Sequence, residues 1–281
     1  IVGYMANNIL PIRLGELVRS YYLGEREGVS KVSTLATIAV ERVFDGLTLL
    51  FFAAVVSFSL PVASFLEELS SDAGIHWLII VLVTSLPFVL SAAIMTFAAC
   101  FPSKFQVITH IVVSILPTRF SQRVSGLIQM FVNGLVVLNH PGKLAYVFVL
   151  SGPVWLSEAI MYYIIGLAFD LQGVFGTVDL IAVILMVTAI SNLAISIPAA
   201  GGGVGTFEVA AASTLTILGV DEALAAAYTI ALHVALLLPV TLAGIIYLWF
   251  DRVSIGQLAK ESQSGSVTAE HGLTQNTEDA I

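Results

Sequence analysis

Residues 77–101 read WLIIVLVTSLPFVLSAAIMTFAACF, and no residue in this run carries a charge. A helix needs about 20 consecutive apolar residues to cross the roughly 30 Å hydrocarbon core of a bilayer. The run therefore predicts a helix that spans a membrane.

Four other runs have the length and apolar character of spanning helices. They are residues 43–62, 144–169, 180–197 and 223–250. A further apolar run, residues 207–220, is too short to cross comfortably alone. The expected fold is therefore all-α, a polytopic helical membrane protein. Two breaks in the apolar pattern, described below, add broken or re-entrant helices and would fit an inverted repeat.

The composition of the whole chain indicates the same class. Hydrophobic residues make up 58% of the 281 residues and charged residues 11%, whereas a soluble domain has roughly 45–50% and 25%. Such a chain cannot cover a globular surface with polar groups, which excludes a soluble enzyme. Apart from Tyr21 and Tyr22, aromatic residues are spread through the apolar runs rather than interleaved with basic residues, so no nucleic-acid partner is expected.

Basic residues lie in alternate segments between the runs, and this predicts the topology. Lysine and arginine occur in residues 1–42, in 102–142 and after the last run, whereas the other loops carry no base. Because basic loops stay in the cytoplasm, we expect a protein of the cytoplasmic membrane whose C-terminus is cytoplasmic. This scheme requires residues 207–220 to count as one crossing.

The two ends of the chain differ from its middle. Residues 254–281 are rich in Ser, Thr, Gln and Glu, which is typical of a disordered tail. Residues 1–253 are then the transmembrane domain. The chain opens at Ile1 in the middle of the pattern, so we expect an N-terminal truncation that removes one or two spans.

The cytoplasmic segment 102–142 has helical periodicity of its own. Leu127, Phe131, Leu135 and Leu138 recur at helical spacing. An amphipathic helix at the membrane interface fits this pattern, and so does a hairpin packed against the bundle.

Two segments break the apolar pattern in a related way. The first is NNILPIRLGELV at residues 7–18, and the second is SIPAAGGGVGTFEV at residues 196–209. Each combines a proline, glycine and a glutamate with a helical run. Such breaks expose backbone N–H and C=O groups, which survive at membrane depth only inside protein or beside a wet cavity. Paired broken helices are typical of transporters.

The second break has two interpretations. Gly201, Gly202 and Gly205 precede a short helix that would start near Thr206, and the N–H groups and dipole of a helix start attract anions. The alternative is a tight glycine turn between two packed helices. No lysine follows the glycines, so a nucleotide-binding loop is not expected.

Several charged residues at the membrane interface are spaced to pair. Arg13, Glu16 and Arg19 are three residues apart, so they share one helix face, and Arg42 and Asp45 have the same spacing. For the arginines, and for Glu41 beside them, ordinary orientation and snorkelling are the alternative to a binding function.

Two glutamates lie within apolar runs. Glu158 follows Pro153 in one long run, and Glu208 opens the short run after the glycines. Charge at membrane depth is expensive, so these residues indicate a function or an internal ion pair, with incidental placement as the alternative.

The sequence offers no catalytic machinery. His233 has no His, Cys or carboxylate three or four residues away that would make a zinc pair, and we expect it to bond a backbone carbonyl in the core. No serine lies in a nucleophile motif, and Cys100 fits plain packing. We therefore expect no catalytic residue, no metal and no cofactor.

Three motifs resemble the lysylphosphatidylglycerol synthase transmembrane (flippase-like) domain family. They are Gly3-Tyr4-Met5-Ala6-Asn7-Asn8 with Pro11-x-Arg13-x-Gly15-Glu16-x-x-Arg19, then Glu41-Arg42-x-x-Asp45-Gly46, and finally Pro198-x-x-Gly201-Gly202-x-x-Gly205-x-x-Glu208. The resemblance implies a multispanning protein of the cytoplasmic membrane. In full-length synthases this domain precedes a soluble aminoacyl-transferase domain and is implicated in moving the modified lipid between leaflets; for the present chain the resemblance implies the membrane part alone.

Two functions are consistent with these features. The first is binding and translocation of an anionic lipid, amino-acylated or linked to a polyprenyl or sugar group, without nucleotide hydrolysis. The second is presentation of lipid to a separately encoded aminoacyl- or glycosyltransferase; a homo-oligomer fits either. The candidate headgroup-binding residues are Asn7, Asn8, Arg13, Glu16, Arg19, Glu41, Arg42, Asp45, Glu158, Gly201, Gly202, Gly205, Thr206 and Glu208.

The two breaks are expected to act on one site. Arg13 or Arg19 would then lie near the turn at 201–208 and attract a phosphate, while the helix start at Thr206 supplies backbone donors. Glu16 and Glu208 would hold the arginines or bind a cationic headgroup.

Overall fold

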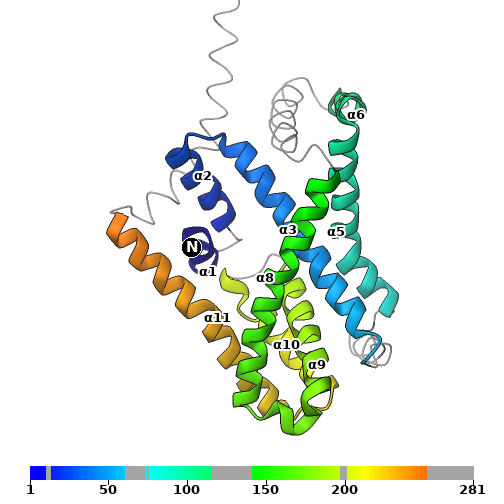
Figure 1. Ribbon diagram of the computed structural model, residues 1–281, viewed down its shortest axis with the longest axis vertical. Helices are drawn as coiled ribbons and strands as arrows, with labels where there is room; N and C mark the ends of the chain where they lie inside the picture. The colour runs from blue at the N-terminus through cyan, green and yellow to red at the C-terminus, as the bar shows by residue number, and fades with distance from the viewer. Residues whose placement is uncertain are drawn as a thin grey trace, which may run out of the picture. The chain divides into compact units, whose positions relative to one another are not determined.

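The computed structural model describes residues 1–10, 14–60, 67, 74, 76–114, 141–196 and 201–251. Within these ranges the chain forms helices and no strand, which confirms the all-α expectation (Figure 1). The elements are α1 (Val2–Ile9), α2 (Gly15–Glu27), α3 (Lys31–Val56), α5 (Trp77–Cys100), α6 (Pro102–Ser114), α8 (Pro141–Ala168), α9 (Leu171–Ile195), the 3-10 turn η2 (Gly201–Gly203), α10 (Thr206–Ile217) and α11 (Glu222–Asp251).

Four helices in the described ranges are long and apolar enough to cross a membrane. They are Leu78–Ala98, Gly142–Ala168, Leu171–Ile195 and Glu222–Phe250. These helices confirm four of the five predicted long spans. The third of them starts earlier than predicted, and Gly176, with φ 75°, interrupts its first part.

The predicted span at 43–62 is wrong in its bounds. Helix α3 begins at Lys31 and ends at Val56. It is not one of the four candidate spans, because Lys31, Glu41, Arg42 and Asp45 lie among its charged residues and interrupt the apolar run. Other predictions lie outside the described residues: the helical stripe from Leu127 to Leu138, the tail 254–281, and Arg13.

The chain divides into two compact units, each built from several segments. The first unit comprises Ile1–Val40, Ala93–Leu144 and Val240–Ile281, and the second comprises Glu41–Ala92 and Ala145–Pro239. Helices α3, α5, α8 and α11 contribute to both units.

In the first unit, α1 and α2 fold against each other (Figure 1). The side-chain oxygen of Asn7 accepts a hydrogen bond of 2.8 Å from the backbone N–H of Gly15, which is the first residue of α2. An N–H group at a helix start has no partner within the helix, so Asn7 caps α2 from another element. Met5, Ala6, Val18 and Leu248 are buried around this contact.

Gly15 is the point at which the two helices come closest. A Cβ atom built on Gly15 would meet the carbonyl oxygen of Gly3 and the backbone nitrogen of Asn7. Because backbone atoms rather than flexible side chains occupy this space, Gly15→Ala should destabilise the protein by about 1–3 kcal/mol. Thermal unfolding in detergent measures this effect. Gly152→Ala is the matched control, since nothing lies within 4 Å of a Cβ there. An equal effect of both substitutions would contradict the close approach.

The core of the second unit joins α8, α9, α10 and α11. Tyr162, Leu180, Phe207, Tyr228 and Leu232 are almost fully buried in it. Helix α10 packs against α9, as the tight-turn interpretation predicts. With 12 residues, α10 is about 18 Å long and shorter than the hydrocarbon core, as the broken-helix interpretation predicts. The packing of α10 therefore fits the tight-turn interpretation, and its length fits the broken-helix interpretation.

Candidate functional site

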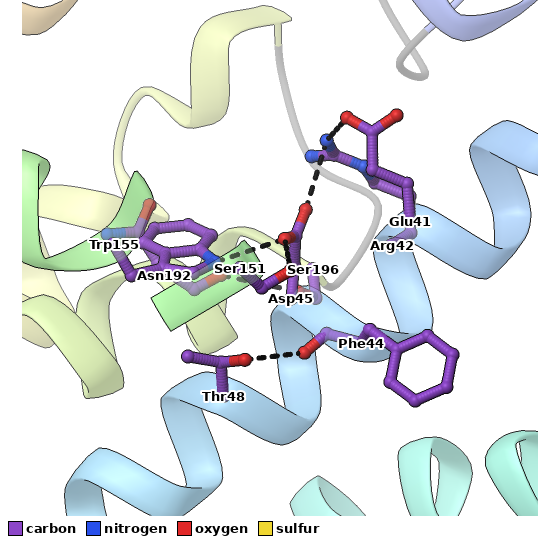
Figure 2. A network of polar contacts seen from close by, with 9 residues as sticks. All are labelled: Glu41, Arg42, Phe44, Asp45, Thr48, Ser151, Trp155, Asn192 and Ser196. Atoms are coloured by element: carbon purple, nitrogen blue, oxygen red, sulfur yellow. Dashed lines mark hydrogen bonds and ion pairs between the residues drawn. The ribbon is translucent and has the colours of Figure 1, made fainter. Parts of the chain in front are cut away.

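Asp45 is the centre of a polar network between α3 and α8 (Figure 2). Its Oδ1 atom accepts hydrogen bonds from Ser151 Oγ at 2.9 Å and from Trp155 Nε1 at 3.2 Å. Its Oδ2 atom lies 3.1 Å from Nη2 of Arg42, one helical turn earlier. Both carboxylate oxygens of a mostly buried side chain are thus satisfied, and the predicted pairing of Arg42 with Asp45 is confirmed.

Arg42 connects this network to the surface. Its Nη2 atom also lies 2.9 Å from Oε1 of Glu41, and about a third of each of these two side chains stays exposed. Glu41, Arg42 and Asp45 therefore form one charged group on α3, in which a single guanidinium bridges two carboxylates (Figure 2).

Helix α8 carries a polar stripe through its apolar sequence. Ser151, Trp155, Glu158 and Tyr162 are spaced by four, three and four residues, so they lie on one helix face. The stripe is about 16 Å long, roughly half the thickness of the hydrocarbon core. Residues between them, such as Val154, Leu156 and Ile160, are exposed and fit contact with lipid tails.

Glu158, the third residue of this stripe, connects α8 to α9 by a hydrogen bond. Its Oε1 atom accepts hydrogen bonds from Tyr162 hydroxyl at 3.1 Å and from Asn192 Nδ2 at 3.0 Å. Asn192 Nδ2 also lies 2.9 Å from the Tyr162 hydroxyl oxygen. Tyr228 of α11 donates to the backbone carbonyl of Tyr162 at 3.1 Å. Glu158 is therefore held by two neutral donors, the Tyr162 hydroxyl and the Asn192 amide.

The glycine turn before α10 is held by Glu208. The Oε2 atom of Glu208 accepts a hydrogen bond of 2.7 Å from the backbone N–H of Gly205, which precedes the helix. Thr206 Oγ1 donates to the carbonyl of Gly203 at 2.9 Å. Gly202, Gly203 and Gly205 all have positive φ angles, which favour glycine. Glu208 thus occupies one of the donors at this helix start, and binding of an anion by the N–H groups that follow stays a prediction.

His233 is the second partner of Glu208. Its Nδ1 atom lies 2.6 Å from Glu208 Oε1, and its Nε2 atom lies 3.0 Å from the carbonyl oxygen of Gly202. Phe207 stacks on the imidazole at a centroid distance of 4.4 Å. The predicted bond to a backbone carbonyl is confirmed. For the ion-pair interpretation of Glu208, the structure supplies His233 of α11 as a partner.

The first unit holds the other candidate residues. Asn7 caps α2, and Asn8 Nδ2 donates to Thr241 Oγ1 of α11 at 2.9 Å. Glu16 and Arg19 lie on α2, and the side-chain stem of Arg19 lies against Gly3 of α1. The two asparagines thus make contacts that hold this unit together. A shared site of Arg13 or Arg19 with the glycine turn stays a prediction.

Five residues of the site were not predicted as site residues from the sequence. Ser151, Trp155 and Tyr162 could have been found from the helical spacing they share with Glu158. Asn192 and His233 could not have been assigned their partners, which lie 34 and 25 residues away. Within the described ranges, no group of three His, Cys, Asp or Glu side chains could hold a metal ion.

A model of the family described as the lysylphosphatidylglycerol synthase TM region matches residues 1–244. The chain belongs to this family. The membership agrees with the four apolar helices and identifies a membrane protein of a lipid-related family.

A relative outside the synthases shares much of the same region. The chain is 25% identical over 223 residues to the glycosyltransferase AglD of Haloferax volcanii, and the match covers 74% of this chain and 35% of that protein. The present chain thus spans about a third of the length of this curated relative. No solved structure matches the chain.

Proposed function

We propose that this protein binds an anionic lipid by its headgroup and moves it between the leaflets of the cytoplasmic membrane without nucleotide hydrolysis. The observation that carries the proposal is the polar stripe on α8. A headgroup that crosses a bilayer needs polar partners at membrane depth, where lipid offers none. Ser151, Trp155, Glu158 and Tyr162 supply such partners over about 16 Å of a mostly apolar helix.

The charges along the stripe favour a headgroup of mixed character. Arg42, one third exposed at the Asp45 network, is suited to a phosphate, since a guanidinium offers a planar set of donors. Glu158 accepts hydrogen bonds and is suited to an ammonium or hydroxyl group. A phosphate that carries an aminoacyl or sugar group combines both kinds of chemistry. Asn7, Asn8, Arg13, Glu16, Arg19 and the glycine turn remain proposed contributors to the same headgroup site.

A second candidate function is supported by the relative. Because a protein named a glycosyltransferase contains a region similar to this chain, the membrane domain could instead present a lipid acceptor to a transferase on a separate chain. The lipid contacts would be the same, but the lipid would stay in its leaflet.

Reconstitution of the full chain into vesicles of phosphatidylcholine and phosphatidylglycerol separates the two functions. Fluorescent phosphatidylglycerol in the inner leaflet is followed by its exposure to a membrane-impermeant quencher. We expect the protein to accelerate exposure relative to protein-free vesicles, and Arg42→Ala to reduce the acceleration. Binding of the probe without acceleration would refute translocation and favour presentation.

A further inference from the structure

The contacts of His233 require a fixed number of protons. Carbonyl and carboxylate oxygens accept hydrogen bonds, so the 3.0 Å contact with Gly202 requires a hydrogen on Nε2. The 2.6 Å contact between Nδ1 and Glu208 Oε1 requires one more hydrogen, on either atom. His233 and Glu208 together therefore hold two protons, either as imidazolium and carboxylate or as neutral imidazole and carboxylic acid.

Loss of one of these protons would break a contact. If the neutral imidazole kept its hydrogen on Nε2, the Nδ1 lone pair would face the Glu208 carboxylate. If the hydrogen moved to Nδ1, the Nε2 lone pair would face the Gly202 carbonyl. Either arrangement sets two acceptors against each other at hydrogen-bond distance, which costs free energy. The proton thus decides whether the glycine turn stays attached to α11.

Few other ionisable groups lie on the elements packed around the pair. Glu158 and Tyr162 of α8 bond each other and Asn192, and Tyr228 of α11 bonds a backbone carbonyl. Helix α9 has no ionisable side chain from Leu180 to Ile195, and Arg42 and Asp45 of α3 pair with each other. Glu208 keeps 28% of its side chain exposed and His233 keeps 4%, so Glu208 is the more accessible member of the pair.

We propose that His233 and Glu208 form a proton-binding site that couples proton binding to the position of the broken helix at Gly201–Gly203 and α10. The proton is the ion that drives lipid movement. The protonated pair holds the glycine turn against α11, and release of the proton detaches the turn from α11. The coupling part of this inference rests on the proposed function, whereas the proton-binding site does not.

Spectroscopy on the full chain in lipid nanodiscs tests the site itself at about pH 7. Nitrogen-15 NMR detects a proton on the imidazole, and infrared spectroscopy detects a protonated carboxyl group; His233→Asn assigns the imidazole signal. We expect the wild type to hold one proton more than Glu208→Gln, because the glutamine amide can donate to Nδ1 without a bound proton. Glu222→Gln, at an exposed position of α11, the helix that carries His233, should keep the proton. Equal proton counts in the wild type and Glu208→Gln would overturn the site.

A lipid assay across a pH gradient tests the coupling. If one proton moves with each lipid, a gradient of about one pH unit should shift the steady-state distribution of fluorescent phosphatidylglycerol up to about tenfold. Glu208→Gln should abolish the shift. Lipid movement that ignores the gradient would overturn the coupling and leave the proposed function standing. Absence of movement under every gradient would refute the proposed function and the coupling together, while the spectroscopic result decides the site.

Discussion

Replacing Asp45 with alanine is expected to destabilise the second unit by about 3 kcal/mol and to abolish lipid movement. The substitution removes the acceptor of Ser151 and Trp155 and the closest buried partner of Arg42. Removal of one member of a buried ion pair costs about 3–5 kcal/mol. The lower end applies here, because Arg42 is one third exposed and Glu41 remains beside it. Thermal unfolding in detergent and the vesicle assay measure the two effects.

Asp45→Asn separates charge from hydrogen bonding. Asparagine can still accept hydrogen bonds from Ser151 and Trp155 but lacks the charge that balances Arg42, so we expect a smaller loss of stability than with alanine. Asp179→Ala is the control, because Asp179 is exposed on α9. If Asp45→Ala unfolds at the same temperature as Asp179→Ala, the network of Figure 2 does not stabilise the unit.

Glu158→Gln is expected to slow lipid movement by about tenfold while the protein keeps its stability. Glutamine retains an acceptor for Tyr162 and Asn192, so the packing of α8 against α9 should survive. A hydrogen bond to an ionised group is roughly twice as strong as a neutral one, and a loss of about 1.4 kcal/mol in headgroup binding is a factor of ten. The rate of probe exposure in vesicles measures the change.

Glu67→Gln provides the comparison for Glu158, since Glu67 is exposed and lies in a predicted external loop. It should leave the rate unchanged at matched protein levels. Equal rates for the two variants and the wild type would show that the carboxylate of Glu158 takes no part in movement, and would leave the polar stripe with a structural role alone.

Much of the architecture followed from the sequence because it depends on local properties. The hydrophobicity of a run adds up residue by residue, so four spanning helices could be predicted without knowledge of their neighbours. The pairing of Arg42 with Asp45 was predictable for a similar reason, since a helix brings residues three apart together. The prediction at 43–62 had the wrong bounds, because a helix does not have to begin and end with its apolar run: α3 extends back through its charged residues to Lys31 and ends at Val56.

The polar contacts between different helices of the site were decided by tertiary structure alone. Asp45 meets Ser151 over a separation of 106 residues, Glu158 meets Asn192 over 34, and Glu208 meets His233 over 25. Within apolar helices the few polar groups must find one another, because lipid satisfies none of them. Composition therefore determines that such contacts form. Which carboxylate meets a serine, an asparagine or a histidine of another helix depends on the rotation and register of packed helices, which no local pattern in the sequence encodes.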